Sequence, residues 1–244
     1  RVDQTWMEGI VMSAQSRLVI AIDGPSGTGK STIARWVAQE LKLSYLDTGA
    51  NYRAATLWSM RNGLDLAQPE TVETHQITDL ITTMPLAQDL NPNHVSVALD
   101  GQDITEAIRS DEVTANVSVP STRPEVRELL VKLQQQAIAS RPRIVVEGRD
   151  ITTVVAPDAD ARILLTASPE VRIARRRQQL RETDQDPTNV ESDVLIRDQK
   201  DSTLVDFMTP STGVAEIDST NLSLEDTVTV VLAEIQRQVN AKQS

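Results

Sequence analysis

The chain contains no cysteine, only two histidines and only six aromatic residues among its 244 residues. Without cysteine it has no disulfide and no thiolate-ligated metal, which favours a reducing compartment, so we expect a cytoplasmic protein. The two histidines, His75 and His94, lie far apart in the sequence, which argues against a histidine metal site. No run of about 18 apolar residues occurs, so we expect no segment that spans a membrane.

The chain is also poor in lysine, with 5 lysines against 19 arginines, and its net charge is −11. That acidity, with so few aromatic residues for base stacking, disfavours a nucleic-acid or membrane partner. Five arginines nevertheless fall between Arg172 and Arg181 with no acid among them. Because the planar guanidinium fork binds phosphate, this cluster indicates a small anionic ligand. The alternative for such a cluster is a solvated helix face.

Short apolar runs alternate with segments of helical spacing along most of the chain. This alternation predicts a three-layer α/β fold with a five-stranded parallel sheet. The predicted strands are residues 18–22, 43–46, 144–146, 163–165 and 214–217. Predicted helices cover residues 31–41, 51–62 and 190–201, and further helices begin at Ser168-Pro169-Glu170 and at Ser223-Leu224-Glu225-Asp226.

The stretch of residues 63–120 differs from the rest because it is polar and carries Pro69, Pro85 and Pro92. Residues 94–99 alternate like an exposed strand, and Asp100-Gly101 is a strong hairpin signal. We interpret residues 63–120 as an inserted, acceptor-binding subdomain, residues 17–62 and 121–240 as the core, and residues 172–189 as a lid. Residues 1–16 are interpreted as an N-terminal extension, with Met12 as an alternative start, and are left out of the fold prediction.

One motif carries a specific chemistry. Gly24-Pro25-Ser26-Gly27-Thr28-Gly29-Lys30-Ser31 matches G-x-x-x-x-G-K-[ST], between a buried strand and an amphipathic helix, as a phosphate-binding loop requires. Its glycines let backbone N–H groups surround phosphate oxygens, Lys30 reaches the β- and γ-phosphates, and Ser31 offers a hydroxyl to Mg²⁺. The motif predicts binding of a nucleoside triphosphate without distinguishing a kinase from a switch.

Six further motifs, with this loop, resemble the bacterial type of cytidylate kinase, a family of nucleoside monophosphate kinases. The resemblance extends from about Leu18 to about Val239. The motifs are Leu46–Arg53, Leu99–Ile104 with Ile108–Arg109, Val117–Arg127, Val146–Ile151, Arg197–Ser202, and Ile217–Ser219 with Leu222–Glu225.

The resemblance implies roles for individual residues. Ser118, Arg127 and Asp150 would recognise cytosine, Arg53 and Arg149 would hold the acceptor phosphate with help from the segment containing Thr48, and Arg197 and Asp201 would approach the acceptor's ribose or phosphate. Lys30, Arg149, Arg175 and Arg177 would stabilise the transferring phosphoryl group, the last two from the lid. Alternatives are a structural ion pair for Arg149 and Asp150, an outer-sphere magnesium role for Asp150, and a helix cap for Ser118.

The implied reaction is transfer of the γ-phosphoryl group of ATP to CMP, and to dCMP, with Mg²⁺, by a monomeric enzyme. The alternatives are a kinase for UMP or another small acceptor and a nucleotide-binding switch module. Four residues depart from the family pattern: Asn51, Thr152, Ala156 and Leu204. Thr152 stands where glycine is usual, which predicts strain in its turn, and Leu204 stands where an arginine is usual, so one expected contact is missing.

Overall fold

The computed structural model describes residues 4–12, 16–182 and 209–243. These form two compact units, one of residues 1–46 and 141–244 and the other of residues 47–140. The predicted inserted segment, residues 63–120, lies inside the second unit. None of the helices in these described stretches combines the length and the apolar character needed to cross a bilayer.

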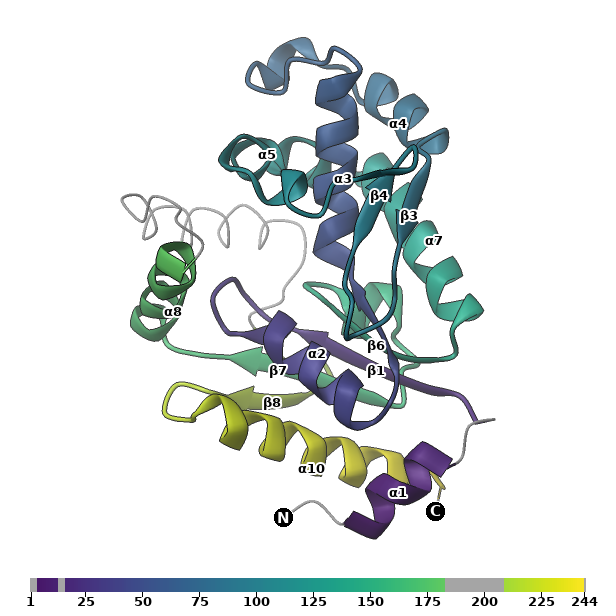
Figure 1. Cartoon of the computed structure of the whole chain (residues 1–244), viewed down its shortest axis with the longest axis vertical. Helices are drawn as coiled ribbons and strands as arrows, with labels where there is room; N and C mark the ends of the chain where they lie inside the picture. The colour runs from purple at the N-terminus through teal and green to yellow at the C-terminus, as the bar shows by residue number, and fades with distance from the viewer. Residues whose placement is uncertain (1–3, 13–15, 183–208, 244) are drawn as a thin grey trace. The chain divides into compact units, whose positions relative to one another are not determined.

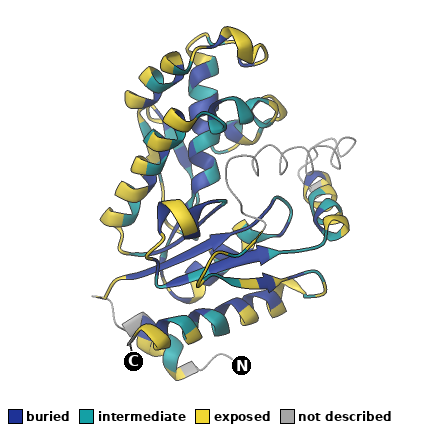
Figure 2. Ribbon diagram, turned by 180° about the vertical axis from the view of Figure 1, so that it is seen from behind, coloured by how far each residue is buried: buried dark blue, intermediate teal, exposed yellow. Residues whose placement is uncertain are grey.

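The first unit is built on a five-stranded parallel sheet with the order β2-β6-β1-β7-β8 (Figure 1). The predicted sheet is confirmed, and each strand begins and ends within two residues of its predicted bounds. The strands are β1 Leu18–Asp23, β2 Ser44–Asp47, β6 Arg143–Gly148, β7 Ala161–Thr166 and β8 Ala215–Asp218. All six residues of β1 are buried, as Figure 2 shows for the centre of this sheet, and β1 lies between β6 and β7.

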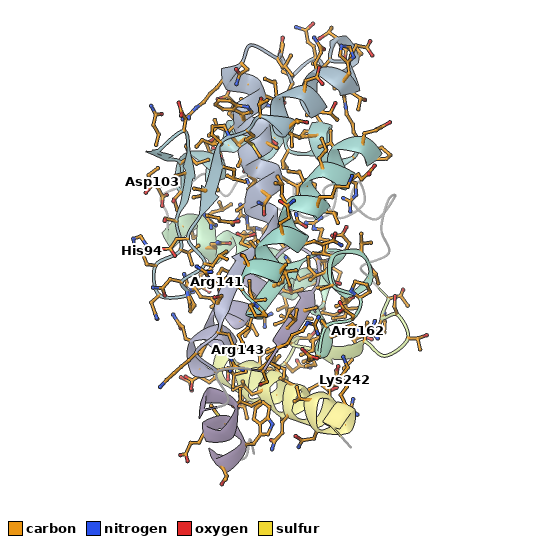
Figure 3. All side chains as sticks on the ribbon, turned by 90° about the vertical axis from the view of Figure 1, so that its right-hand side faces the viewer. His94, Asp103, Arg141, Arg143, Arg162 and Lys242 are labelled. Carbon is orange, nitrogen blue, oxygen red and sulfur yellow. The ribbon has the colours of Figure 1, made fainter. Side chains whose placement is uncertain are left out.

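Among the described residues, five helical segments accompany this sheet: α1 Gln4–Met12, α2 Lys30–Glu40, the π-helical turn η3 Ile151–Val155, α8 Pro169–Glu182 and α10 Leu224–Gln243. α2 and α10 pack against the sheet and against each other. The predicted start of α10 is confirmed, since Ser223 Oγ accepts the Asp226 N–H at 3.0 Å. The sequence prediction left out α1, yet the α1 carbonyl of Ile10 accepts a 2.7 Å hydrogen bond from Arg143, a residue labelled in Figure 3.

The second unit surrounds α3 Thr48–Arg61. Its other elements are η1 Pro69–Thr71, α4 Thr74–Thr82, β3 Leu86–Gln88, β4 Val97–Leu99, β5 Gln102–Asp103, η2 Ala107–Arg109, α5 Asp111–Asn116, α6 Ser118–Ser121 and α7 Pro124–Ser140. Consecutive alanines place α3 between two apolar clusters: Ala55 packs with residues of α4 and α7, and Ala54 packs with residues of β4. α3 is therefore buried on two sides.

Two local predictions in this unit have different outcomes. The hairpin turn is confirmed, because Leu99 pairs with Gln102 across Asp100 and Gly101, whose φ angles are +49° and +74°. The predicted start of α3 at Asn51 is wrong by three residues. The side chain of Asp47 accepts the Ala50 N–H at 3.1 Å and so caps a helix that begins at Thr48.

Candidate active site

The glycine-rich loop leaves β1 and enters α2, and two of its glycines are required by close backbone approaches. A Cβ at Gly24 would collide with the backbone carbonyl oxygen of Leu165. A Cβ at Gly27, where φ is +81°, would lie 2.6 Å from the carbonyl oxygen of Arg172. A side chain at either position would push the loop away from β7 or α8, so the glycines fix its path as well as allowing its conformation.

Two arginines of α8 hold the carbonyl groups of this loop. Arg172 Nη1 donates to the Ser26 carbonyl oxygen at 3.1 Å, and Arg175 Nη1 donates to the Thr28 carbonyl oxygen at 3.1 Å. In a trans peptide the C=O and the following N–H point in opposite directions. The arginines therefore help to orient the N–H groups that follow these two carbonyls away from α8. Arg172 is buried, so for this residue the alternative of a solvated helix face does not hold.

Arg175 also ties the loop to the segment after β8. It donates to Ser219 Oγ at 2.9 Å and to the Ser219 carbonyl oxygen at 2.8 Å. Partial burial lowers the pKa of the Arg175 guanidinium, and the negative charge of Asp218 opposes that change. The group nevertheless stays protonated at any physiological pH. Arg177, by contrast, is exposed on α8.

Glu147, near the end of β6, brings together the two functional side chains of the motif. Ser31 Oγ donates to Glu147 Oε1 at 2.6 Å, Tyr45 Oη donates to the same oxygen at 3.3 Å, and Lys30 Nζ lies 3.8 Å from Glu147 Oε2. Glu147 is 2% exposed, so a buried carboxylate faces the lysine ammonium and the serine hydroxyl. This places a fixed negative charge beside the expected triphosphate-binding groups.

The pair of Ser31 and Glu147 fits a magnesium ion. Mg²⁺ prefers oxygen ligands and in phosphoryl-transfer sites is held by one or two protein oxygens together with substrate phosphates. A hydroxyl and a carboxylate oxygen 2.6 Å apart supply such donors. Within the described residues no three His, Cys, Asp or Glu side chains gather into a group that could hold a metal ion.

Glu147 belongs to the motif Val146–Ile151, but the sequence alone assigns it no role in the site. The reason is that the contact depends on strand pairing across the sheet: β6 runs parallel to β1, with Glu147 opposite Ile22. A charged residue directly after the apolar run 144–146, in a strand adjacent to β1, is the signal that could have identified it.

The same pairing brings Arg149 and Asp150, which are predicted to bind the acceptor nucleotide, near the glycine-rich loop. Asp23 at the end of β1 is opposite Gly148 at the end of β6, so Gly24 and Arg149 leave neighbouring strand ends. Arg149 is half-buried and Asp150 is 5% exposed. The expected strain at Thr152 is absent, because among the described non-glycine residues only Lys42 and Asp100 have a positive φ.

The second unit contains the remaining described acceptor candidates. Arg53 donates to the Ile108 carbonyl oxygen at 3.0 Å and to Thr114 Oγ1 at 2.8 Å, so its guanidinium already joins α3 to η2 and α5. Thr48 is buried at the first position of α3. Asn51, one turn along, is buried with an Oδ1 that has no hydrogen-bond partner in the part of the chain that the structure describes.

Ser118 and Arg127 lie on successive helices of this unit. Ser118 is the first residue of α6, and its carbonyl oxygen accepts the Thr122 hydroxyl at 2.7 Å. The Arg127 guanidinium lies 5.7 Å from the centre of the Tyr52 ring and donates to the Ser121 carbonyl oxygen at 3.3 Å. Arg197, Asp201 and Leu204, with the end of the predicted lid and the helix 190–201, lie outside the described residues.

Comparisons with known proteins identify the family to which this chain belongs. A family model described as cytidylate kinase matches residues 20–237. A cytidylate kinase from Rhodococcus jostii is 45% identical over 93% of this chain and 99% of its own, and one from Streptomyces griseus is 41% identical over 94% and 97%. The solved structure of shikimate kinase from Acinetobacter baumannii, in complex with shikimate, aligns with a TM-score of 0.45 and 15% identity over 93% of this chain and 97% of its own. The chain belongs to the cytidylate kinase family.

Proposed function

We propose that this chain transfers the γ-phosphoryl group of ATP to CMP, giving ADP and CDP, and that it accepts dCMP as well. The observation that carries the proposal is the contact of Lys30 and Ser31 with the buried Glu147, at the junction of β1 and α2, in a member of the cytidylate kinase family. Backbone N–H groups, a lysine and magnesium-binding oxygens are the parts that a phosphoryl-transfer site needs.

ATP would be held by the loop Gly24–Ser31. The N–H groups of the loop and the N-terminal end of α2 favour negative charge, and Lys30 adds a full positive charge beside the β- and γ-phosphates. Ser31, and in our proposal Glu147, would hold Mg²⁺, which supplies positive charge to the phosphate oxygens. Arg175 and Arg177 would add positive charge during transfer, Arg175 from a guanidinium that already orients a loop carbonyl.

CMP would be bound through its phosphate by Arg53 and Arg149, with Thr48 nearby, and through its base by Ser118, Arg127 and Asp150. We also keep the predicted roles of Arg197 and Asp201 toward the acceptor. A monophosphate carries nearly two negative charges, so cationic side chains must offset its repulsion from ATP. Hydrogen-bond donors and acceptors for the base edge would then distinguish cytosine from other bases.

The chemistry requires no general base. A phosphate oxygen of CMP attacks the γ-phosphorus, the bond from that phosphorus to the β–γ bridging oxygen breaks, and ADP leaves with the bond's electron pair. Positioning and charge stabilisation provide the rate enhancement.

A panel of acceptors tests the proposal: ADP release from ATP is measured with CMP, dCMP, UMP, AMP, GMP and shikimate, each with and without Mg²⁺. We expect the highest kcat/KM for CMP, a measurable rate for dCMP, and no turnover without Mg²⁺. A higher kcat/KM for UMP would favour the alternative pyrimidine acceptor. Turnover of AMP, GMP or shikimate in preference to both pyrimidines would refute the assignment, and size-exclusion chromatography of the same sample tests the expected monomer.

A further inference from the structure

A buried carboxylate at the end of β1 holds the turn that follows β6. Asp23, which is 3% exposed, accepts the Ile151 N–H through Oδ1 at 2.7 Å. Its Oδ2 accepts both the Thr152 N–H at 2.9 Å and the Thr152 hydroxyl at 2.6 Å. One carboxylate therefore receives three hydrogen bonds from two consecutive residues, and the Thr152 side chain supplies one that glycine or valine could not.

Arg162 of β7, labelled in Figure 3, holds the same turn through another group. Its Nη1 donates to the Thr152 carbonyl oxygen at 3.3 Å, while its Nη2 donates to the Thr212 carbonyl oxygen at 3.1 Å. The turn itself is π-helical, with the Val155 N–H donating to the Asp150 carbonyl oxygen at 3.1 Å. Side chains from two neighbouring strands thus fix a turn whose hydrogen-bonding pattern is uncommon and frequent at functional sites.

The position of this turn gives it a functional consequence. Arg149 and Asp150 are the two residues directly before Ile151, so the hydrogen bonds to Asp23 set the direction in which the chain presents them. Burial raises the pKa of Asp23 to about 6, and the nearby negative charge of Asp150 adds to this rise. The three donors favour the ionised form, which partly offsets the cost of burying the charge.

We propose that Asp23 and Thr152 are positioning residues for the acceptor nucleotide. They fix the turn that carries Arg149 and Asp150, and they act through these two residues without touching substrate. The inference rests on the proposed function, because it assumes that Arg149 and Asp150 bind CMP. A purely structural network would stabilise the fold without distinguishing the acceptor from ATP.

The test compares two substitutions of the same kind at adjacent residues. Thr152→Val keeps the shape of the side chain and removes its hydroxyl, whereas Thr153→Val makes the same change where the side chain is exposed. We expect Thr152→Val to raise the KM for CMP about tenfold, as loss of one hydrogen bond to a charged group implies, with the KM for ATP within about twofold. Thr153→Val should match the wild type, and Thr152→Ser, which keeps the hydroxyl, should return the KM for CMP to within about twofold.

Asp23→Asn provides a second, independent variant, because it keeps the shape of the carboxylate but replaces one of its two accepting oxygens by a donor. Calorimetric titration with CMP should show weaker binding, again by about tenfold or more, in a protein whose circular dichroism is unchanged. If the wild type neither binds nor phosphorylates CMP, the proposed function and this inference fail together. If the wild type does both and Thr152→Val alters neither KM, or alters both equally, only the inference is overturned.

Discussion

The two units hold their predicted phosphate-binding groups in different ways. In the first unit the triphosphate-binding loop is backbone, and its path is fixed by contacts of Gly24 and Gly27 and by two arginines that hold its carbonyl oxygens. In the second unit the predicted acceptor group Arg53 is a side chain that already binds the carbonyl oxygen of Ile108 and the hydroxyl of Thr114. The loop is preorganised for an anion, whereas Arg53 must share or exchange its present partners.

This difference predicts how the triphosphate-binding residues and the acceptor-binding residues each respond to mutation. Changes at the triphosphate side should act on catalysis, because preorganised groups stabilise charge that develops during transfer. Changes at the acceptor side should act first on the KM for CMP and also on stability, because the same side chains support the fold of their unit. The first three variants below test this division.

The largest effect is expected for Lys30→Ala. Removing the ammonium beside the β- and γ-phosphates should lower kcat by about 1,000-fold or more, while the fold persists because Lys30 is not a core residue. The measurement is the steady-state rate of ADP release with CMP, with thermal unfolding as a check on the fold. Lys132→Ala, at an exposed lysine that pairs only with Glu128 in the described contacts, is the control and should keep the wild-type rate. A Lys30→Ala enzyme with undiminished kcat would remove the loop from the mechanism.

Glu147→Gln should come next. The substitution keeps the size of the side chain but removes the charge that faces Lys30 and accepts the Ser31 hydroxyl, so we expect kcat to fall by about 100-fold. The apparent affinity for Mg²⁺ should weaken as well, which is measured by titrating the rate with the metal at fixed ATP. Glu225→Gln, at an exposed acid of α10, serves as the control. Unchanged Mg²⁺ dependence would assign Glu147 a purely structural role.

Arg53→Ala should raise the KM for CMP by about 30-fold with a smaller change in kcat, because a charge-assisted contact to the acceptor phosphate would be lost. The variant should also unfold at a lower temperature, since the hydrogen bonds to Ile108 and Thr114 disappear. Arg61→Ala, on the same helix but exposed, is the matched control. A lower melting temperature with the KM for CMP unchanged would show that Arg53 only supports its unit.

The smallest effect concerns the pH dependence of stability. Asp23 has its pKa raised from 3.8 to about 6 in the folded chain, so the folded state retains this proton to higher pH than the unfolded state. The contribution of Asp23 to the free energy of unfolding should therefore decrease as pH rises through 6, by about 1.4 kcal/mol between pH 5 and pH 7.5. Urea unfolding at these two pH values should show the decrease in the wild type relative to Asp23→Asn. A difference that grows with pH would contradict the raised pKa.

Local signals explain what the sequence could predict. The buried run 18–22, the glycines that follow it, the Asp100-Gly101 hairpin and the cap at Ser223 each lie within a few residues of the structure they specify. The start of α3 also has a local signal, Asp47 as a cap, which lies outside the helix predicted from Asn51.

Contacts between distant residues cannot be predicted from such local signals. Glu147 reaches Ser31 across 116 positions, Arg175 reaches Thr28 across 147, and Asp23 reaches Thr152 across 129. Each contact depends on which strands or helices become neighbours, and the sequence shows the strands without their order. The family resemblance supplied residues for the acceptor site, but it did not show that Arg53 already bonds to neighbouring groups of its own unit.

Calorimetric titration of the folded chain with ATP and Mg²⁺ tests the central claim most directly, because every role proposed here begins with the loop Gly24–Ser31 binding a triphosphate. The account predicts saturable binding of about one ATP per chain, abolished or strongly weakened in Lys30→Ala and unchanged in Lys132→Ala. A well-folded wild type that takes up no ATP, or a Lys30→Ala variant that binds ATP as tightly as the wild type, would contradict it.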